Sequence, residues 1–319
     1  MNFSRPAAAV LLCLTASQVA AAYPERPIRM IAPASAGGPT DVIARAVSLP
    51  LSEILGKPIV IDNRAGAAGL IGTDMVAKAI PDGYTLLFGF SGPMSIVPHV
   101  VKSVPYDPVK DFAHVSLVAS APYVLLAHPA LPVKNVKDLV ALAKAQPGKF
   151  NFASGGNGTG IHMAGELFNH AAGIRIVHVP YKGAGPGMSA LIAGEVNIMF
   201  NGLSPALPQI RSNRLRGLAV GGDKRSSLLP ELPTVAESGL KFSVDGWYNL
   251  SAPRGTPRPI IAKLHKDLLR ALAHPETKAR LDALAVEPIG ATGDQFVIML
   301  KGELAKWEQV VKAAGIKAE

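Results

Sequence analysis

Cysteine is almost absent from this chain, since Cys13 is the only cysteine among its 319 residues. It lies in an N-terminal stretch that we expect to be removed. The remaining chain then has no disulfide, no thiolate nucleophile and no cysteine-ligated metal. Leu12 precedes Cys13, whereas lipid attachment favours a small residue there, so we do not expect a lipoprotein.

Aromatic and charged residues are also few, at 6% and 17% of the chain. The net charge of +9 is scattered, and its densest stretch is RSNRLRG, with Arg211, Arg214 and Arg216. Neither a basic arm nor the spacing of aromatic residues that stacks on bases occurs, so we expect no nucleic-acid partner. The 49% of hydrophobic residues is ample for a large core, and the length suggests two domains.

The opening stretch, MNFSRPAAAVLLCLTASQVAAA, has the order of a secretory signal peptide: a basic residue, an apolar run and small residues at its end. The apolar run from Pro6 to Leu14 is shorter than the roughly 20 residues that a membrane-spanning helix needs. We therefore expect residues 1–22 to be cleaved near Ala22 and Tyr23 and the mature chain to reside in the periplasm. Export without cysteine fits a bacterial periplasm.

Strand-like apolar runs alternate with helix-like segments along the first two thirds of the mature chain. The strand candidates are PIRMIAP, PIVIDN, YTLLFGF, KFNFAS, IRIVHVPY, VNIMF and LRGLAV. The helices expected between them cover residues 39–55, 66–79, 160–172, 185–193 and 204–211. This alternation predicts an α/β fold with parallel sheets that helices cover on both faces.

Two other apolar runs, HVSLVASAPYVLLAHP and GWYNLSAPRGTP, lie far apart in the sequence and each end at a proline turn. We interpret them as two crossings between domains, so that both ends of the chain build the first domain. The expected division is residues 23–122 with 246–319 for the first lobe and 123–245 for the second lobe. From about Arg258 onward, the sequence predicts mostly helix.

Glycine-rich segments follow strand candidates and precede helices at three places: residues 31–47, 153–166 and 181–194. Glycine permits close approach of the backbone, and the start of a helix offers bare N–H groups to an anion. The first segment alone is best explained as a tight turn. Three such segments, one in the first lobe and two in the second, indicate a cleft that is lined by backbone donors, because ligands of α/β sheets bind at these loops.

Signatures of enzymes and metal sites are missing from the sequence. The run GGNGTG is not the dinucleotide-binding motif, no phosphate-binding P-loop motif occurs, and neither Ser91 nor Ser154 completes G-x-S-x-G. His162, Glu166 and His170 share a helix face but span about 12 Å, too far for one metal ion. Lys182 has no partner base and is expected to face ligand or solvent. We therefore expect no enzyme, no cofactor and no metal.

Several segments together resemble the substrate-binding receptors of tripartite tricarboxylate transporters, also called the Bug family. They are YPERPIRMIAPASAGGPTDVIAR, LGKPIVIDNRAGAAGLIGTDMVAKAIPDGYTLLF, VPYDPVKDFAHVSLVAS, ASGGNGTGIHMAGELF, HVPYKGAGPGMSALIAGEVNIMF, LRGLAVGGDKRSSLLPELPTVAESG and APRGTP. The resemblance covers essentially the whole mature chain, with the motifs in the expected order. It implies a type II periplasmic-binding-protein fold, with two α/β lobes joined by two crossing segments.

The resemblance also implies a non-catalytic receptor, expected as a monomer, that captures a small carboxylate and delivers it to membrane permease subunits. Such ligands include dicarboxylates, tricarboxylates and aromatic acids, and backbone N–H groups and bridging waters hold them. Carried onto this chain, the implied ligand-binding residues are Ser35, Ala36, Gly37, Gly38, Thr40, Asp41, Ser91, Ser154, Gly155, Gly156, Asn157, Gly158, Thr159, His162, Tyr181, Lys182, Gly183 and Asn201.

The chain departs from the family pattern at two positions. Ala34 stands where the family usually has a bulky aromatic residue, and Asn201 stands where it often has aspartate. We expect Ala34 to widen the mouth of the site and Asn201 to make an amino-acid ligand less favourable. The alternative to a transport receptor is a protein of the same fold whose ligand is sensed by a signalling partner.

Overall fold

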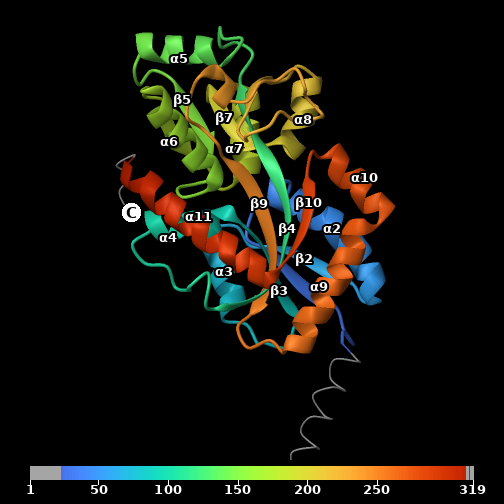
Figure 1. The fold of residues 1–319 in the computed structure, drawn as a ribbon. Coiled ribbons are helices and arrows are strands. Elements are labelled where there is room, and N and C mark those ends of the chain that lie inside the picture. Colours follow the sequence, from blue (N-terminus) through green and yellow to red (C-terminus); the bar gives the residue numbers. More distant parts are fainter. Residues whose placement is uncertain (1–22, 314–315, 317–319) are drawn as a thin grey trace, which may run out of the picture.

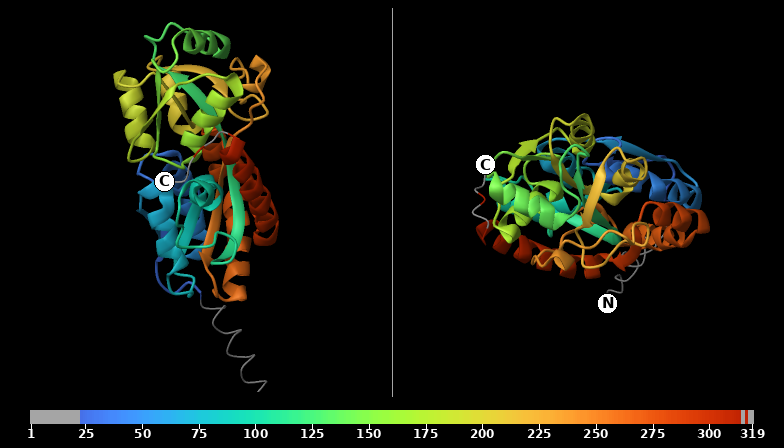
Figure 2. Two further views of the ribbon diagram at one scale, coloured as in Figure 1. Left: turned by 90° about the vertical axis from the view of Figure 1, so that its left-hand side faces the viewer. Right: turned by 90° about the horizontal axis from the view of Figure 1, so that it is seen from above.

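A computed structural model describes residues 23–313 and 316. The expected signal peptide, residues 1–22, lies outside the described residues. The chain forms two α/β lobes that are stacked end to end, and the long strand β4 (Phe112–Ala127) runs through both of them (Figures 1 and 2). Within the described residues, no helix is both long enough and apolar enough to cross a bilayer.

The first lobe is a sheet covered by helices on both faces. Its strands are β1 (Ile28–Ala32), β2 (Ile59–Asn63), β3 (Thr85–Phe90), β9 (Asp245–Pro253), β10 (Glu287–Thr292) and the first part of β4. One face packs on α2 (Pro39–Leu55), α9 (Arg258–Ala273) and α10 (Pro275–Ala283). The other face packs on α3 (Leu70–Ala77), the short helix η2 (Gly92–Ile96) and α11 (Gly293–Ala313). Apolar residues such as Ile43, Val47 and Leu51 recur on the buried side of α2, which is why that helix packs on the sheet.

The second lobe repeats this construction around a smaller sheet. Its strands are β5 (Asn151–Ser154), β6 (Val177–Pro180), β7 (Ile198–Gly202), β8 (Arg216–Val220) and the last part of β4. The helices α5 (Val136–Ala145), α6 (Gly160–Ala172), α7 (Ala184–Ala193) and α8 (Leu203–Arg211) belong to this lobe, and η3 (Ala236–Ser238) follows β8. A single apolar cluster fills the space between them.

Strand β4 changes partners between Pro122 and Tyr123. Pro122 and the residues before it pair antiparallel with β9, where Pro122 faces Asp245. Tyr123 pairs with Gly202 at the end of β7, and the residues after it pair with β7 and β8. The strand order is therefore β2-β1-β3-β9-β4-β7-β5-β6, with β8 and β10 also paired to β4.

Most elements lie where the sequence predicts them, and several differ. The helix expected over 66–79 begins only at Leu70, because Ala67 and Ala68 have positive φ and form the short helix η1 (Ala67–Gly69). Strand β10 interrupts the C-terminal third that was expected to be mostly helical. The sequence also predicts no helix at η2, at α4 (Val97–Val100) or at α5.

Candidate functional site

A cavity of about 640 Å³ lies between the two lobes, at the carboxyl ends of strands from both. Its volume is in the range of roughly 300–1,000 Å³ that is typical of small-molecule sites. Segments that follow β1, β2, β3, β5 and β6 form most of the wall, and the crossing strands form the rest. The wall residues are 33–35, 38–40, 65–70, 90–91, 100–101, 123, 155–157, 159–161, 180–184 and 246–248.

Three helices begin at this cavity: α2 at Pro39, α6 at Gly160 and α7 at Ala184. The first turn of a helix leaves its backbone N–H groups without partners inside the helix. In the described chain no side chain caps α2 or α7, because Gly38 and Gly183 stand before them. The partial positive charge of these helix starts therefore faces the cavity.

The side chain of Asp41 makes its hydrogen bonds next to the loop between β1 and α2 and does not line the cavity. Its carboxylate accepts hydrogen bonds from Gly37 N at 2.9 Å and from Arg45 Nε at 3.0 Å. Burial raises the pKa of Asp41, but the hydrogen bonds from Arg45 and Gly37 outweigh burial and leave the pKa below its ordinary value. The charged carboxylate thus fixes the loop without placing a negative charge on the cavity wall.

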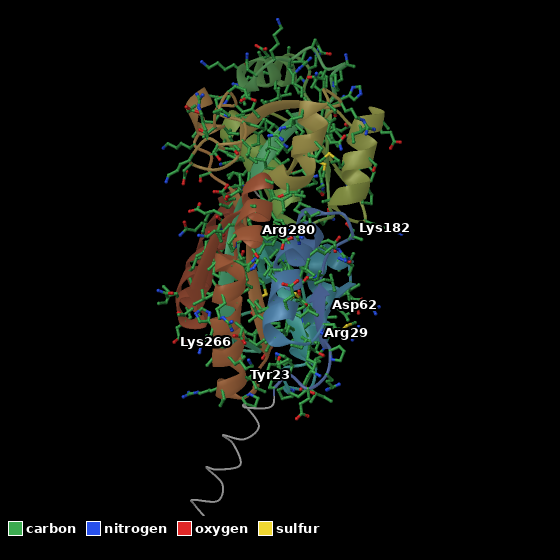
Figure 3. The ribbon with its side chains drawn as sticks, turned by 90° about the vertical axis from the view of Figure 1, so that its right-hand side faces the viewer. Tyr23, Arg29, Asp62, Lys182, Lys266 and Arg280 are labelled. Carbon is green, nitrogen blue, oxygen red and sulfur yellow. The ribbon has the colours of Figure 1, made fainter. Side chains whose placement is uncertain are left out.

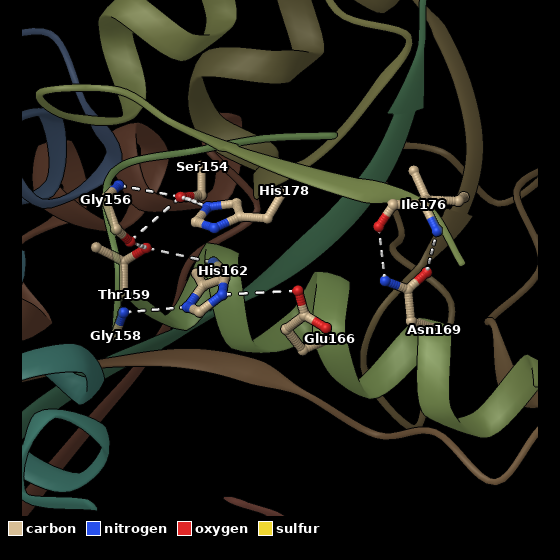
Figure 4. A network of polar contacts seen from close by, with 9 residues as sticks. All are labelled: Ser154, Gly156, Gly158, Thr159, His162, Glu166, Asn169, Ile176 and His178. Carbon is tan, nitrogen blue, oxygen red and sulfur yellow. Dashed lines mark hydrogen bonds and ion pairs between the residues drawn. The ribbon is translucent and has the colours of Figure 1, made fainter. Parts of the chain in front are cut away.

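The stacked imidazole rings of His162 and His178 support the glycine loop of residues 154–159 in the second lobe (Figure 4). His178 Nε2 lies 2.6 Å from Ser154 Oγ, and Ser154 Oγ accepts a hydrogen bond from Gly156 N at 3.0 Å. His162 Nδ1 accepts one from Gly158 N at 3.1 Å, and the two ring centroids are 4.0 Å apart. Burial, and then the neighbouring His162, lower the pKa of His178 to about 3, so this ring is neutral at ordinary pH.

Thr159 completes the support of this loop. Its Oγ1 accepts a hydrogen bond from His162 N at 3.2 Å, which caps α6, and donates one to Gly156 O at 2.8 Å. On the far side of the stack, His162 Nε2 lies 3.7 Å from Glu166 Oε1 (Figure 4). Ser154 and the two imidazoles therefore support the loop from outside the cavity wall, on which Gly155, Gly156, Asn157 and Thr159 lie.

The two lobes touch on both sides of the cavity. On one side, a methyl group built on Gly183 would collide with Ser35 Oγ. On the other side, a methyl group on Gly158 would lie 2.7 Å from Val100 Cγ2. The lobes are thus closed together, and Ser35 Oγ is a buried atom with no hydrogen-bond partner in the described chain. Buried polar atoms usually have a hydrogen-bond partner from protein or ordered water, so this hydroxyl group is available to a ligand in the cavity.

The wall carries little charge. Among the described residues that line the cavity, Lys182 is the one with a charged side chain, and it is exposed at the junction of the lobes (Figure 3). The hydroxyl groups of Tyr123 and Tyr248 are neutral, because burial raises the pKa of Tyr123 to about 12 and that of Tyr248 well above its ordinary value. An anion in this cavity would be held by neutral donors and helix termini.

The structure brings most of the residues singled out from the sequence to this one cavity. Those on its wall are Ser35, Gly38, Thr40, Ser91, Gly155, Gly156, Asn157, Thr159, Tyr181, Lys182 and Gly183, and Ala34 is there too. The others do not line it: Ala36, Gly37, Asp41, Ser154, Gly158, His162 and Asn201. Asn201 is buried in β7, where Oδ1 accepts from Gly202 N at 2.8 Å.

Several wall residues were not singled out from the sequence, and most of them fall into two groups. Tyr123, Trp247 and Tyr248 come from the crossing strands, which carry no local motif for a binding site. Residues 65–70, in the run AGAAGL, form a further loop of small residues after a strand. These small residues after a strand could have predicted a binding loop, but the sequence predicts a helix over residues 66–79.

Comparison with known proteins shows to which family the chain belongs. Residues 43–316 match the receptor family of the tripartite tricarboxylate transporters. The chain belongs to this receptor family. Its members are periplasmic solute-binding receptors and not enzymes, with the type II periplasmic-binding-protein fold. The chain is 38% identical to the protein BugT of Bordetella pertussis over 327 residues, which cover 99% of both chains.

Two solved structures of similar receptors carry organic acids. The Rhodopseudomonas palustris protein Rpa4515 with adipate has a TM-score of 0.90 and 34% identity, and the match covers 93% of this chain and 100% of that one. MatC from the same organism, with bound malate, has a TM-score of 0.87 and 32% identity, and the match covers 91% and 100%. The receptor family and its fold are thereby established for this chain.

Proposed function

We propose that this receptor captures a small carboxylate in the cavity between its lobes and delivers it to the membrane permease of a tripartite tricarboxylate transporter. The observation that carries the proposal is the convergence of the starts of α2, α6 and α7 on one cavity whose wall has no acidic side chain in the described chain. The adipate and malate of the similar receptors are carboxylates, which supports the same class here.

Simple energetics favour capture by both lobes together. One helix start contributes about 0.3–1 kcal/mol, and up to about 2 kcal/mol when it is partly buried. Micromolar binding needs about 8 kcal/mol. Even three helix starts fall short of this, so exclusion of water and contact with the rest of the ligand must supply the remainder. We therefore place the ligand between closed lobes and not on one of them.

We further propose the residue roles and the lobe boundaries. Ser35, Gly38, Thr40 and Ser91 bind from the first lobe, which comprises residues 23–122 and 246–319. The loop 155–159 and residues 181–183 bind from the second lobe, residues 123–245. The change of partners in β4 between Pro122 and Tyr123 supports this division. Ser154 and His162 position the second loop from behind.

A thermal-shift screen tests the proposed function. Protein purified from cells that express the full chain is screened with mono-, di- and tricarboxylates, amino acids and neutral sugars. A ligand that binds only the native state stabilises it by about 2.7 kcal/mol at a hundredfold excess over Kd. A rise in melting temperature with carboxylates supports the proposal. The proposal is refuted if only neutral sugars raise the melting temperature, or if none of the carboxylates does. A transport role further predicts that deleting the gene abolishes uptake of the same acid.

A further inference from the structure

Trp247 brings a large aromatic ring to the wall of the cavity between the lobes. It lies in β9 close to the point where the chain crosses between the lobes, and the residue is 6% exposed. Its indole packs edge-to-face with the ring of Phe296 on α11, and the two ring centroids are 5.3 Å apart. The shape of the wall at this place therefore depends on the orientation of the indole.

A carboxylate on α11 binds the one polar group of this indole. Trp247 Nε1 donates a hydrogen bond to Glu303 Oε2 at 3.3 Å. Figure 1 shows α11 lying across β9 near the junction of the lobes. Glu303 is not among the described residues of the cavity wall, so the hydrogen bond directs the indole N–H toward α11. Because an indole has a single donor and no acceptor, this contact fixes which edge of the ring faces the ligand space.

Glu303 also binds the second of the chain's two tryptophans. Trp307 Nε1 donates to the same Oε2 atom at 3.1 Å, and Lys306 Nζ donates to Oε1 at 3.2 Å. Trp307 is buried in the apolar cluster that fills the second lobe, whereas Trp247 belongs to a cluster of the first lobe. The carboxylate is thus held by neighbours on its own helix while it orients a ring on the cavity wall.

An ordered wall favours binding. Ordering one side chain when a ligand binds weakens the affinity by about two- to twelvefold. Without its acceptor, the buried indole N–H would be left unpaired, which favours other orientations of the ring. The negative charge of Glu303 has the opposite effect on an anionic ligand, because it repels that ligand. A loss of affinity on removal of Glu303 would therefore come from the ring and not from the charge.

We propose that Glu303 is a positioning residue for ligand binding. It orients the Trp247 indole as part of the cavity wall and does not touch the ligand itself. The inference rests on the proposed function, because that function places the ligand in this cavity. It goes beyond that function, since the helix starts and glycine loops that hold the carboxylate do not involve α11.

Isothermal titration calorimetry tests the proposal on protein purified from cells that express the full chain. Adipate is the first probe, because the similar receptor Rpa4515 carries it, and the acid with the largest thermal shift replaces adipate if adipate does not bind. We expect Glu303→Ala to raise the Kd about two- to twelvefold. Glu303→Gln should leave the Kd nearly unchanged, because its amide oxygen still accepts from the indole.

The control Glu308→Ala removes another carboxylate of α11. Glu308 pairs with Lys312 at 2.7 Å in solvent and lies outside the cavity wall, so its loss should leave the Kd unchanged.

A double-mutant cycle shows whether Glu303 acts through Trp247. Trp247→Phe removes the N–H group but keeps an aromatic ring on the wall. In that background Glu303→Ala should have little further effect on the Kd, because the contact is already gone. In the background of Trp307→Phe, the same change should weaken binding as it does in the unchanged chain.

The indole N–H signals of the two tryptophans in an amide NMR spectrum report the contact directly. Trp307→Phe leaves the signal of Trp247 alone and so identifies it. We expect this signal to move when the ligand binds. In Glu303→Ala it should shift and exchange faster with water, because the N–H has lost its acceptor. A purely structural contact would lower the melting temperature of Glu303→Ala without changing the Kd.

The outcomes separate this inference from the proposed function. If the unchanged chain binds no carboxylate, the proposed function fails and the inference fails with it. If an acid binds but folded Glu303→Ala has an unchanged or lower Kd, the inference is wrong while carboxylate capture stands. An equal loss of affinity with and without Trp247→Phe would also overturn it, because Glu303 would then act through another residue. If Glu303→Ala does not fold, Glu303→Met replaces it, since methionine has a similar size and no oxygen acceptor.

Discussion

Replacing Gly202 with alanine tests whether the lobes must close to bind. Gly202 ends β7 with φ −58° and ψ 140°, a conformation that alanine adopts without strain. A Cβ atom there would lie 2.8 Å from Pro39 Cγ and 2.9 Å from Pro39 Cβ. Pro39 begins α2 in the first lobe, whereas Gly202 belongs to the second. The added methyl group therefore collides with its neighbour when the lobes are closed, and opening the lobes relieves the collision.

The expected cost follows from the contact. Forcing an extra methyl group into a packed contact costs about 1–3 kcal/mol. If only the closed form binds ligand, this cost is subtracted from binding, and the Kd for the preferred acid rises about 5- to 150-fold. The melting temperature without ligand should change little, because the open form contains no collision. Calorimetry measures the Kd, and a thermal melt without ligand measures the stability.

Gly302→Ala provides the matched control. Gly302 lies inside α11 with nothing within 4 Å of a built Cβ, so alanine should stabilise the helix by up to about 1 kcal/mol and leave the Kd unchanged. An unchanged Kd in Gly202→Ala would refute the requirement for closure. The requirement would also be refuted if Gly202→Ala lowered the melting temperature equally with and without ligand. The collision would then be present in the ligand-free protein as well.

Three other predictions follow from single contacts. Burial lowers the pKa of His114 from 6.5 to about 4, so its contribution to the free energy of unfolding is complete above pH 6.5 and is lost as pH falls through 4, with a slope of at most about 1.4 kcal/mol per pH unit. The lowered pKa of His178 adds its own slope over the same range. Urea unfolding of His114→Phe should lose the His114 part of the slope and keep the His178 part, and an unchanged slope contradicts the assignment. Gly160→Ala would place a methyl group against Tyr123 Oη, so ligand affinity should fall and the added change Tyr123→Phe should restore part of it, whereas no rescue would locate the damage elsewhere. His178→Phe keeps the ring stack but removes the contact with Ser154 Oγ, so acid binding should weaken several-fold by calorimetry at an unchanged melting temperature, and full affinity would show that this contact does not position the loop.

The order of strands and helices could be predicted from the sequence because it depends on short local patterns of apolar residues, glycine and proline. The helices α2 and α6 begin and end where composition places them, since Gly38 and Pro39 mark one start and Thr159 caps the other. Strand β10 was not predicted, because its pairing with β4 joins segments far apart in the chain and leaves no local signature.

The candidate site was predictable to the extent that its donors are backbone groups in glycine loops. Gly155, Gly156 and Gly183 reach one cavity because parallel strands present their carboxyl ends at a common edge. Tyr123 and Trp247 could not be found, because only the crossing of β4 and β9 brings them to the cavity. His178 escaped notice for a similar reason, since its role depends on stacking with His162 from a different element.

Carboxylate recognition is the central claim, and a matched pair of ligands tests it most directly. Calorimetry compares the tightest-binding acid of the panel with its own primary amide, which has nearly the same shape but no charge. The helix starts and Ser35 Oγ predict that the acid binds and that the amide binds roughly 100-fold more weakly, since charge-assisted hydrogen bonds are the stronger ones. Equal affinity for the two would contradict the claim.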